Sequence, residues 1–443
     1  MSFTSEQLKH QLSTLAAGSP ARRFVVAFSG GLDSTILLHA LQSLHDELAI
    51  PVIAVHVQHD LHPDALIWES HCEATATEFG VDYRTVAIEV DRSSGRGLEA
   101  SARNARYEAL QQMMQTGDWL LSAHHQDDQA ETLLLNLLRG SGMAGLAGIG
   151  RIQAFGPAQL VRPLLDVPQE ELRAYAAAHG LTWLDDPSNA DTDFDRNYLR
   201  HDVLPILAKR WPAASSRLAR SAELASEASA LLDHLADDDL QSLGQPQRIE
   251  ITALSALPDD RQRNVLRRAL KRSGLNSAPT TALRRIIDEL LPAKADAEPL
   301  VSWKGAQARR YRDFLYLLPE LPNNPTDQNY KLNTDNRSVA LPGLGSVSLD
   351  ERAGPGIRRA VIENGLEIRF RTGGEEIRPV GHECTHKLKK LLQQEGIVPW
   401  MRDRIPLLYV GNHLVAVANL WISADEADNN GLCVRWENHP TLY

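Results

Sequence analysis

The sequence predicts an α/β fold built on a doubly wound parallel sheet, followed by a mostly helical domain and a small α+β domain. Three observations predict this order. Between residues 23 and 180, short β-rich runs alternate with segments of helical period. From residue 215 to 235 the chain is a continuous Ala/Leu/Ser-rich helical stretch. Beyond residue 340, strand-like runs separated by glycine-containing turns return.

The N-terminal α/β domain is expected over residues 1–211. Its strands are predicted at 23–28 (RFVVAF), 51–58 (PVIAVHVQ), 82–88 (DYRTVAI) and 118–123 (DWLLSA). Ligands of such sheets bind at the carboxyl ends of the strands. Because the first strand ends at Phe28, the residues from Ser29 to Ser34 should lie at the ligand-binding edge.

The remaining chain is divided into two domains by composition. A mostly helical domain is expected over 212–320, with helices at 215–235, 259–274 and 280–291. A Pro/Asn-rich linker is predicted over 321–345, and the α+β domain over 346–443. Within the last domain, the Gly411-Asn412 pair suits a β-hairpin and residues 385–396 (THKLKKLLQQEG) suit a helix.

Composition restricts the class of protein. The 443 residues are 43% hydrophobic and 23% charged, which is typical of a water-soluble protein with two or three domains. No apolar run reaches the ~18 residues of a membrane span and no secretory leader is visible, so we expect a cytoplasmic protein with no membrane partner. Cys72, Cys384 and Cys433 are too few and too scattered for a disulfide framework or a Cys-x-x-Cys site.

The net charge of −11 argues on average against a nucleic-acid partner. Two local stretches differ from this average. Residues 196–220 hold six basic side chains against one acidic one, and six basic residues lie between Arg261 and Arg272 without an acid. Such runs are usually solvated helix faces, so either stretch alone is weak evidence for nucleic-acid binding.

The stretch FSGGLDST, from Phe28 to Thr35, predicts an anion site. Its glycines precede a predicted helix, where free amides and the helix dipole favour an anion. The alternative is a simple tight turn in which Asp33 and Ser34 cap the helix. The stretch lacks the G-x-x-x-x-G-K-[ST] of nucleoside triphosphatases and the G-x-G-x-x-G of dinucleotide sites. The residues concerned are Ser29, Gly30, Gly31, Leu32, Asp33 and Ser34.

Ser-Gly-Gly-x-Asp-Ser after a first strand resembles the PP-loop of the ATP pyrophosphatase superfamily. The resemblance implies that the loop binds the pyrophosphate end of ATP and that the reaction releases pyrophosphate. Asp33 is then a candidate to orient Mg²⁺ on that pyrophosphate. Four further stretches are similar to the bacterial tRNA(Ile)-lysidine synthetase family: LEASARNARYEAL, SAHHQDDQAETLLLNLLRGSGMAGL, LDDPSNADTDFDRNYLRHDVLPIL and HKLKKLLQQEGIVPWMRDRIPLLY.

That resemblance covers nearly the whole chain and is loosest between residues 230 and 350. It implies that ATP adenylates the wobble cytidine of a CAU-anticodon tRNA(Ile), after which L-lysine displaces AMP to give lysidine. The partners would be the tRNA and L-lysine. No obligate protein partner is evident, and the family leaves a homodimer open. Strand two ends HVQHDL, with Asp60 where many relatives have glycine.

Three carboxylates follow the fourth predicted strand. Asp127 and Glu131 are i, i+4 neighbours, and Glu131 is also i+3 from Asp128, so the three side chains can converge. They could hold a lysine ammonium, bind Mg²⁺ or accept a proton; alternatively they are first-turn acids that complement the helix dipole. His124 and His125 resemble half a zinc site but lack a partner at ligand spacing, so we expect His125 to contact substrate or support the fold.

Arginines are the candidate oxyanion ligands. Arg103 follows Glu99 by four residues, which suits a surface ion pair, whereas the resemblance places Arg103 in the active site as a catalytic group. Asp195 is expected to be a helix N-cap. Arg196 and Arg200 recur one turn apart. The resemblance places Arg200, with Arg196 and Asn197, towards ATP or the target base.

The C-terminal domain carries the expected tRNA contacts. A lysine-rich helix is usually only solvated. The family, however, grips tRNA with its C-terminal domains, and phosphate contacts would supply affinity while an extruded base supplies selectivity. The candidates are Lys387, Lys389, Lys390, Arg402 and Arg404.

Other functions fit less well. Related tRNA thiolases need catalytic cysteines, and Cys72, Cys384 and Cys433 are far apart in sequence. Glutamine-dependent amidotransferases need a glutaminase domain, and residue 2 is a serine. A factor that binds tRNA and ATP without chemistry would not need a cluster of three acids.

Overall fold

The computed structural model describes residues 3–16, 20–59, 65–88, 98–294, 297–322, 330–333, 335–351 and 354–442. Side chains at 59 and 98–100 are outside this description, as is Asp60, so the departure at Asp60 and the expected pairing of Glu99 stay untested. The chain folds as two compact units, Met1–Leu232 and Asp233–Tyr443. The division into three domains with a linker remains a prediction.

A six-stranded sheet forms the centre of the first unit, in the order β3-β2-β1-β4-β6-β5. The four predicted strands are confirmed and pair in parallel. A short hairpin, whose second strand is parallel to β4, completes the sheet and was not anticipated, because its outer strand is largely exposed and shows no apolar alternation. The strands are β1 (Arg23–Ala27), β2 (Val52–His59), β3 (Asp82–Ile88), β4 (Asp118–Leu121), β5 (Ile152–Phe155) and β6 (Ala158–Val161).

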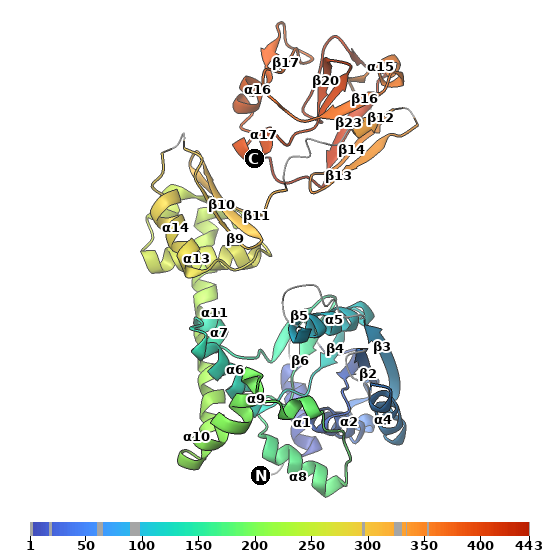
Figure 1. Cartoon of the computed structure of the whole chain (residues 1–443), viewed down its shortest axis with the longest axis vertical. Helices are drawn as coiled ribbons and strands as arrows, with labels where there is room; N and C mark the ends of the chain where they lie inside the picture. The colour runs from blue at the N-terminus through green and yellow to red at the C-terminus, as the bar shows by residue number, and fades with distance from the viewer. Residues whose placement is uncertain are drawn as a thin grey trace. The chain divides into compact units, whose positions relative to one another are not determined.

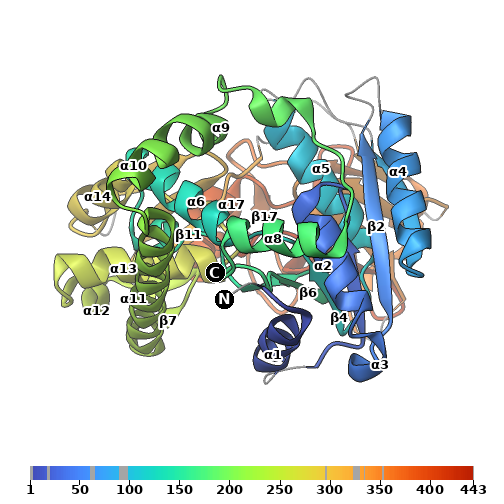
Figure 2. The same ribbon diagram turned by 90° about the horizontal axis from the view of Figure 1, so that it is seen from below.

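Helices cover both faces of this sheet, as the doubly wound prediction requires (Figures 1 and 2). Alternate residues of β1 face opposite sides: Phe24 and Val26 belong to one buried cluster and Val25 to another. The first cluster includes residues of α1 (Ser5–Leu15), α2 (Leu32–Gln42), α4 (Ala65–Glu78) and α8 (Gln169–His179). The second includes Leu110 of α5 (Leu98–Met113). Helix α3 (His45–Leu48) follows α2.

The rest of the first unit is helical. After β4 come α6 (Gln126–Leu138) and α7 (Met143–Leu146); after α8 come a 3₁₀ turn (Pro187–Ala190), α9 (Asp195–Tyr198), a π-helical turn (Leu199–Val203) and α10 (Leu204–Arg210). Asp195 is not the N-cap that we expected. Phe194 holds that position, and the Asp195 carboxylate accepts a hydrogen bond from Arg139 at 3.3 Å.

The predicted helices beyond residue 212 are present. They are α11 (Ala214–Leu243), α12 (Ile251–Ser255), α13 (Asp259–Arg272) and α14 (Thr280–Arg285), which continues as a π-helical turn (Ile286–Leu290). A five-stranded antiparallel sheet packs with them in a common core and was not anticipated. The signal existed, because Lys304-Gly305 separates two β-rich runs. The strands are β7 (Gly244–Gln245), β8 (Arg248–Glu250), β9 (Leu300–Trp303), β10 (Ala306–Tyr311) and β11 (Phe314–Pro319).

The C-terminal part is α+β, as predicted. Its larger sheet has the order β12-β16-β19-β20-β21, and the Gly411 turn joins β19 to β20 with φ +58°. Strands β12 and β13 fall inside the predicted linker. The strands are β12 (Tyr330–Leu332), β13 (Ser338–Leu341), β14 (Gly345–Asp350), β15 (Gly356–Ile357), β16 (Leu366–Arg369), β17 (Glu376–Ile377), β18 (His386–Lys387), β19 (Leu407–Val410), β20 (His413–Val417), β21 (Trp421–Ile422), β22 (Ala427–Asp428) and β23 (Cys433–Glu437). The helices are α15 (Arg359–Glu363), α16 (Leu388–Gln394) and α17 (Pro399–Arg402).

Among the described residues, no helix has the length and apolar character needed to cross a membrane.

Candidate active site

The loop from Ser29 to Gly31 connects β1 to α2 at the carboxyl edge of the sheet. Its shape is held from within: Ser34 Oγ lies 3.1 Å from both Ser29 Oγ and the Gly31 carbonyl oxygen, and it accepts the Ser29 N–H at 3.3 Å. The N–H of Leu184 donates to the Gly30 carbonyl at 3.0 Å from outside the loop. Hydrogen bonds within the protein therefore hold the loop in shape, and the N-terminus of an 11-residue helix lies beside it.

The two glycines of the loop differ in their geometry. Gly30 has φ +75°, and a Cβ there would lie 2.8 Å from Cys72 Sγ. Gly31 has φ −80°, and a Cβ there would make only ordinary contacts. Glycine is thus required by the fold at position 30. At position 31, any requirement must come from a ligand.

Asp33 does not cap α2, contrary to one sequence interpretation. Gly31 holds the N-cap position without a side-chain bond, and Asp33 is the second residue of the helix. Its Oδ1 is buried and has no hydrogen-bond partner, while its Oδ2 lies 3.5 Å from His125 Nε2. A buried carboxylate oxygen without a partner is unusual and indicates a ligand position.

His125 precedes α6 at the end of the β4 segment and is 1% exposed. Burial by itself lowers its pKa, but the hydrogen bond to Asp33 and the charges of Asp128, Asp33 and Asp127 outweigh burial and raise the pKa to about 9. At neutral pH His125 is therefore a cation between Asp33 and the acids of α6.

Two of the three predicted carboxylates converge on two arginines. Glu131 is fully buried; Arg196 Nε donates to its Oε2 at 2.7 Å, and Arg200 Nε donates to its Oε1 at 2.6 Å. Asp128 Oδ1 accepts from Nη2 of Arg196 at 2.6 Å and of Arg200 at 3.2 Å. The predicted common orientation of Arg196 and Arg200 is confirmed, and all four charges form one network.

This network changes what the carboxylates can do. Burial would raise the pKa of Asp128, but the positive charges of His125 and Arg196 prevail and hold it at about 2. Asp127 points elsewhere, and its Oδ2 accepts the backbone N–H of Gln169 at 2.9 Å. Asp127 Oδ2 also lies 3.8 Å from His125 Nδ1, so Asp127 shares the charge of His125 with Asp128 but does not join the arginine network, and Asp128 is a very weak base.

The other predicted site residues lie in different surroundings. Asn197 donates to the carbonyls of Ser188 (2.9 Å) and Asp191 (2.8 Å), so it secures a loop, and its substrate contact stays a prediction. Arg103 lies over the Tyr107 ring, 5.4 Å from its centroid. His124 Nδ1 is 2.6 Å from Ser122 Oγ, and burial lowers the pKa of His124 to about 4, so it stays neutral.

A cavity of about 250 Å³ adjoins the loop. It lies where β1 and β2 end, which suits the nucleoside part of a nucleotide. The sequence analysis assigned no role to Trp68, Arg106 or Asp186 of its lining. Arg106 and Asp186 lie inside the quoted stretches LEASARNARYEAL and LDDPSNADTDFDRNYLRHDVLPIL, and Trp68 lies in the helix that follows β2. The lining consists of Ala27, Phe28, Ser29, Gly31, Val55, His56, Val57, Trp68, Arg106, Leu110, Leu184, Asp186 and Asn189.

Within the described part of the chain, no three His, Cys, Asp or Glu side chains form a preformed metal site. Cys72 is buried, Cys384 is exposed and Cys433 is half-buried. Burial raises the pKa of the Cys72 thiol to about 12, so Cys72 is unsuited to nucleophilic chemistry.

Most of the basic stretch on α13 is neutralised inside the second unit. Arg268 pairs with Asp233 and Asp237 of α11, and other basic residues of α13 pair with the same helix. This stretch is therefore a packing interface rather than an open basic face. The additional pairs are Arg261–Asp239, Lys271–Asp233 and Arg272–Asp237.

The predicted tRNA contacts at the C-terminus fall into two groups. Lys387, Lys389 and Lys390 are exposed at the start of α16. Arg402 instead donates to the Ile397 carbonyl at 2.9 Å and to the Tyr311 hydroxyl at 3.0 Å. Arg404 donates to the carbonyls of Trp400 and Pro322. These two arginines are half-buried and support the fold, and their predicted contact with tRNA stays a prediction.

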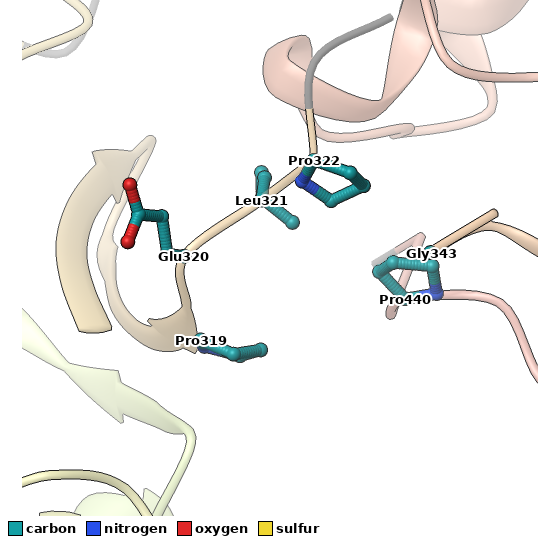
Figure 3. Close-up of a pocket in the computed structure, with 6 residues that line it drawn as sticks. All are labelled: Pro319, Glu320, Leu321, Pro322, Gly343 and Pro440. Atoms are coloured by element: carbon teal, nitrogen blue, oxygen red, sulfur yellow. The ribbon is translucent and has the colours of Figure 1, made fainter. Parts of the chain in front are cut away.

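A second cavity lies in the second unit (Figure 3). Figure 3 shows Gly343 and Pro440 across the space from Leu321 and Pro322. Prolines, a leucine and a glycine give no chemistry, and Glu320 is its one ionisable lining residue. The candidate active site is therefore the loop in the first unit.

Comparisons with known proteins match the chain to one family. The family described as the PP-loop domain matches residues 4–207, the TilS substrate binding domain matches 250–316, and the TilS substrate C-terminal domain matches 366–437. The tRNA(Ile)-lysidine synthase of Alkalilimnicola ehrlichii is 44% identical over 92% of this chain and 91% of its own. This chain belongs to the tRNA(Ile)-lysidine synthase family.

Two further members of the tRNA(Ile)-lysidine synthase family give the same result. The protein from Coxiella burnetii is 39% identical over 95% of this chain and 93% of its own, and that from Methylococcus capsulatus is 37% identical over 97% and 100%. The alignment thus covers both units, and the sequence resemblance is confirmed.

Proposed function

We propose that this protein is an ATP-dependent ligase that joins L-lysine to carbon 2 of the wobble cytidine of CAU-anticodon tRNA(Ile). The products are lysidine, AMP and pyrophosphate, and the modified tRNA reads AUA instead of AUG. One observation carries the proposal. The Ser29–Gly31 loop at a helix N-terminus lies beside the Asp33–His125 pair, in a chain that matches lysidine synthases over nearly its full length.

The first step is adenylation. The loop amides and the N-terminus of α2 bind the β- and γ-phosphates, and the adjoining cavity accepts the nucleoside. The cytidine oxygen O2 attacks the α-phosphorus, and pyrophosphate leaves. Arg196 and Arg200 lie on the same edge, and we assign them to the negative charge that develops on the α-phosphate. Arg103 on α5 is a further candidate for this role.

Magnesium fits one position in this site. Mg²⁺ in nucleotide sites uses one or two carboxylates together with phosphate oxygens. Asp33 Oδ1 is a buried oxygen without a protein partner, as such a ligand position requires. When bound, the ion would neutralise charge on the departing pyrophosphate. The protonated His125 holds the other oxygen of Asp33 and fixes the orientation of the carboxylate.

In the second step the ε-amine of lysine attacks carbon 2 and AMP leaves. The amine is protonated in water at neutral pH and must lose a proton. We considered Asp128 and Glu131 as the base, but Asp128 has a pKa of about 2, and Glu131 receives both Arg196 and Arg200. We therefore assign both acids to positioning the two arginines.

For tRNA contact we retain Lys387, Lys389 and Lys390. They are exposed, and they carry three positive charges within four residues. Contacts with phosphate would supply affinity that weakens with salt and carries no sequence information. Selection of the wobble cytidine then depends on the active site.

The test combines the full chain with Mg-ATP, labelled L-lysine and CAU-anticodon tRNA(Ile), and measures label on the tRNA. The matched control is the same tRNA with uridine in place of the wobble cytidine. We expect label on the first tRNA and none on the second. Pyrophosphate release without lysine incorporation would contradict the proposal.

A further inference from the structure

Arg162 is a buried arginine whose charge the protein leaves unmatched. It directly follows β6, at the same edge of the sheet as the loop after β1, and the Ser122 N–H donates to the preceding carbonyl of Val161 at 3.0 Å. Arg162 is 5% exposed. The sequence analysis assigned no role to Arg162.

The surroundings of Arg162 contain little to balance its charge. Its Nε has no hydrogen-bond partner, and its Nη1 donates to the Gly150 carbonyl at 2.6 Å. Among the residues that the structure describes, no carboxylate forms an ion pair with it. Burial lowers its pKa, the hydroxyl of Tyr107 raises it through charge and a hydrogen bond, and the positive charge of Arg103 lowers it further. Buried charges are normally paired, so an unpaired one at a ligand edge indicates an anionic ligand.

The other arginines of this edge behave differently. Arg196 and Arg200 share Asp128 and Glu131 as ion-pair partners, so each has a protein partner even when no substrate is bound. Among the described arginines at this edge of the sheet, Arg162 is the one that is both buried and without an ion pair. Its planar fork suits a carboxylate or a phosphate.

The burial of Arg162 decides between the anions of the proposed reaction. The phosphates of ATP have their own site at the N-terminus of α2, reached from a different strand of the sheet. A tRNA phosphate is held on a bulky polymer and needs an accessible cation, as Lys389 and Lys390 are. A small free amino acid needs less room than a polymer beside a side chain that is only 5% exposed.

On these grounds we propose that Arg162 binds the α-carboxylate of L-lysine and so fixes the end of the substrate opposite the reacting amine. This inference rests on the proposed lysine ligation and names the residue that recognises lysine as an amino acid. A site with a buried cation rejects analogues that lack the anion, because the cation would then stay unpaired.

The test compares L-lysine with cadaverine, which has the same amine chain without the carboxylate. We measure kcat/KM for each amine with the full-length wild type, R162Q and R162K, at saturating ATP and tRNA. The wild type should prefer lysine by about 10- to 100-fold, the range of a charge-assisted bond. R162Q should raise the KM for lysine by a similar factor and leave cadaverine unchanged; R162K should fall between them.

Formation of adenylated tRNA without lysine should be the same in R162Q and wild type. R151Q is the matched control, because Arg151 precedes β5 nearby but pairs with Asp166 at the surface. Equal use of both amines by the wild type, or an equal loss of both in R162Q, would overturn the inference. A raised KM for tRNA with an unchanged KM for lysine would also overturn it and assign Arg162 to a tRNA phosphate. If the wild type incorporated neither amine, the proposed function itself would fail.

Discussion

Gly30 and Gly31 are adjacent, yet we expect alanine to affect them in different ways. In Gly30→Ala, the new Cβ must adopt φ +75°, which costs about 1–2 kcal/mol in a non-glycine residue. It would also lie 2.8 Å from Cys72 Sγ, which is fully buried, and such overpacking costs about 1–3 kcal/mol. We therefore expect a loss of about 2–5 kcal/mol in the free energy of unfolding.

Gly31→Ala is the matched control. Its φ of −80° suits alanine, and the nearest atoms to a Cβ are Ser29 Oγ at 3.5 Å and the Leu184 carbonyl oxygen at 3.8 Å. The free energy of unfolding should change by less than about 0.5 kcal/mol. If the loop backbone approaches the phosphates of ATP, the same variant should nevertheless weaken ATP binding, because the methyl group occupies the ligand side.

Urea unfolding followed by tryptophan fluorescence measures both variants, since Trp119 is buried in the same unit. A third variant, Gly30→Ala with Cys72→Ala, removes the close contact but keeps the strained backbone. It should be less destabilised than the sum of its single changes by about 1–3 kcal/mol. The reasoning is refuted if Gly30→Ala unfolds like the wild type, or if Gly31→Ala is equally destabilised.

Three further changes test separate parts of the site. His125 has a folded pKa raised from 6.5 to about 9, so the stability that its charge contributes is full below pH 6.5 and is lost as the pH rises through 9. The difference in unfolding free energy between wild type and His125→Gln should therefore shrink between pH 6.5 and 9. A difference that stays constant over this range would contradict the reasoning. Asp33→Ala should abolish pyrophosphate release while tRNA binding stays within about twofold, and lost tRNA binding would refute this division of roles. Replacing Lys389 and Lys390 with alanine should reduce the slope of the logarithm of the tRNA binding constant against the logarithm of salt concentration by about 1–2. Arg402→Gln should instead lower thermal stability and leave this slope unchanged.

The phosphate loop could be read from the sequence because its determinants are local. A strand, two glycines and a helix start within a dozen residues specify a backbone conformation, and Gly30 has the positive φ that this conformation requires. The four parallel strands were equally clear, since each is a short apolar or β-branched run flanked by turns. The common orientation of Arg196 and Arg200 followed from helical spacing.

The sequence failed where a side chain could choose between partners that are distant along the chain. Arg402 looked like a tRNA contact, but folding brings the Tyr311 hydroxyl within 3.0 Å of it. Asp33 looked like a helix cap, but the helix begins one residue before it. The short antiparallel strands between residues 244 and 319 also escaped notice, although Lys304-Gly305 separates two β-rich runs, because the strong helical pattern of the neighbouring segments dominated the interpretation.

The sequence by itself determined the α/β class, the order of the helical and α+β parts, and the conformation of the loop, since these depend on period, turn residues and spacing along a few turns of chain. The tertiary structure alone decided which charges are balanced. Asp128 and Glu131 are neutralised by arginines more than 60 residues away, whereas Arg162 is buried without a described carboxylate partner. A charge acquires its pKa and its partner only when distant segments are packed together, and local sequence does not record that packing.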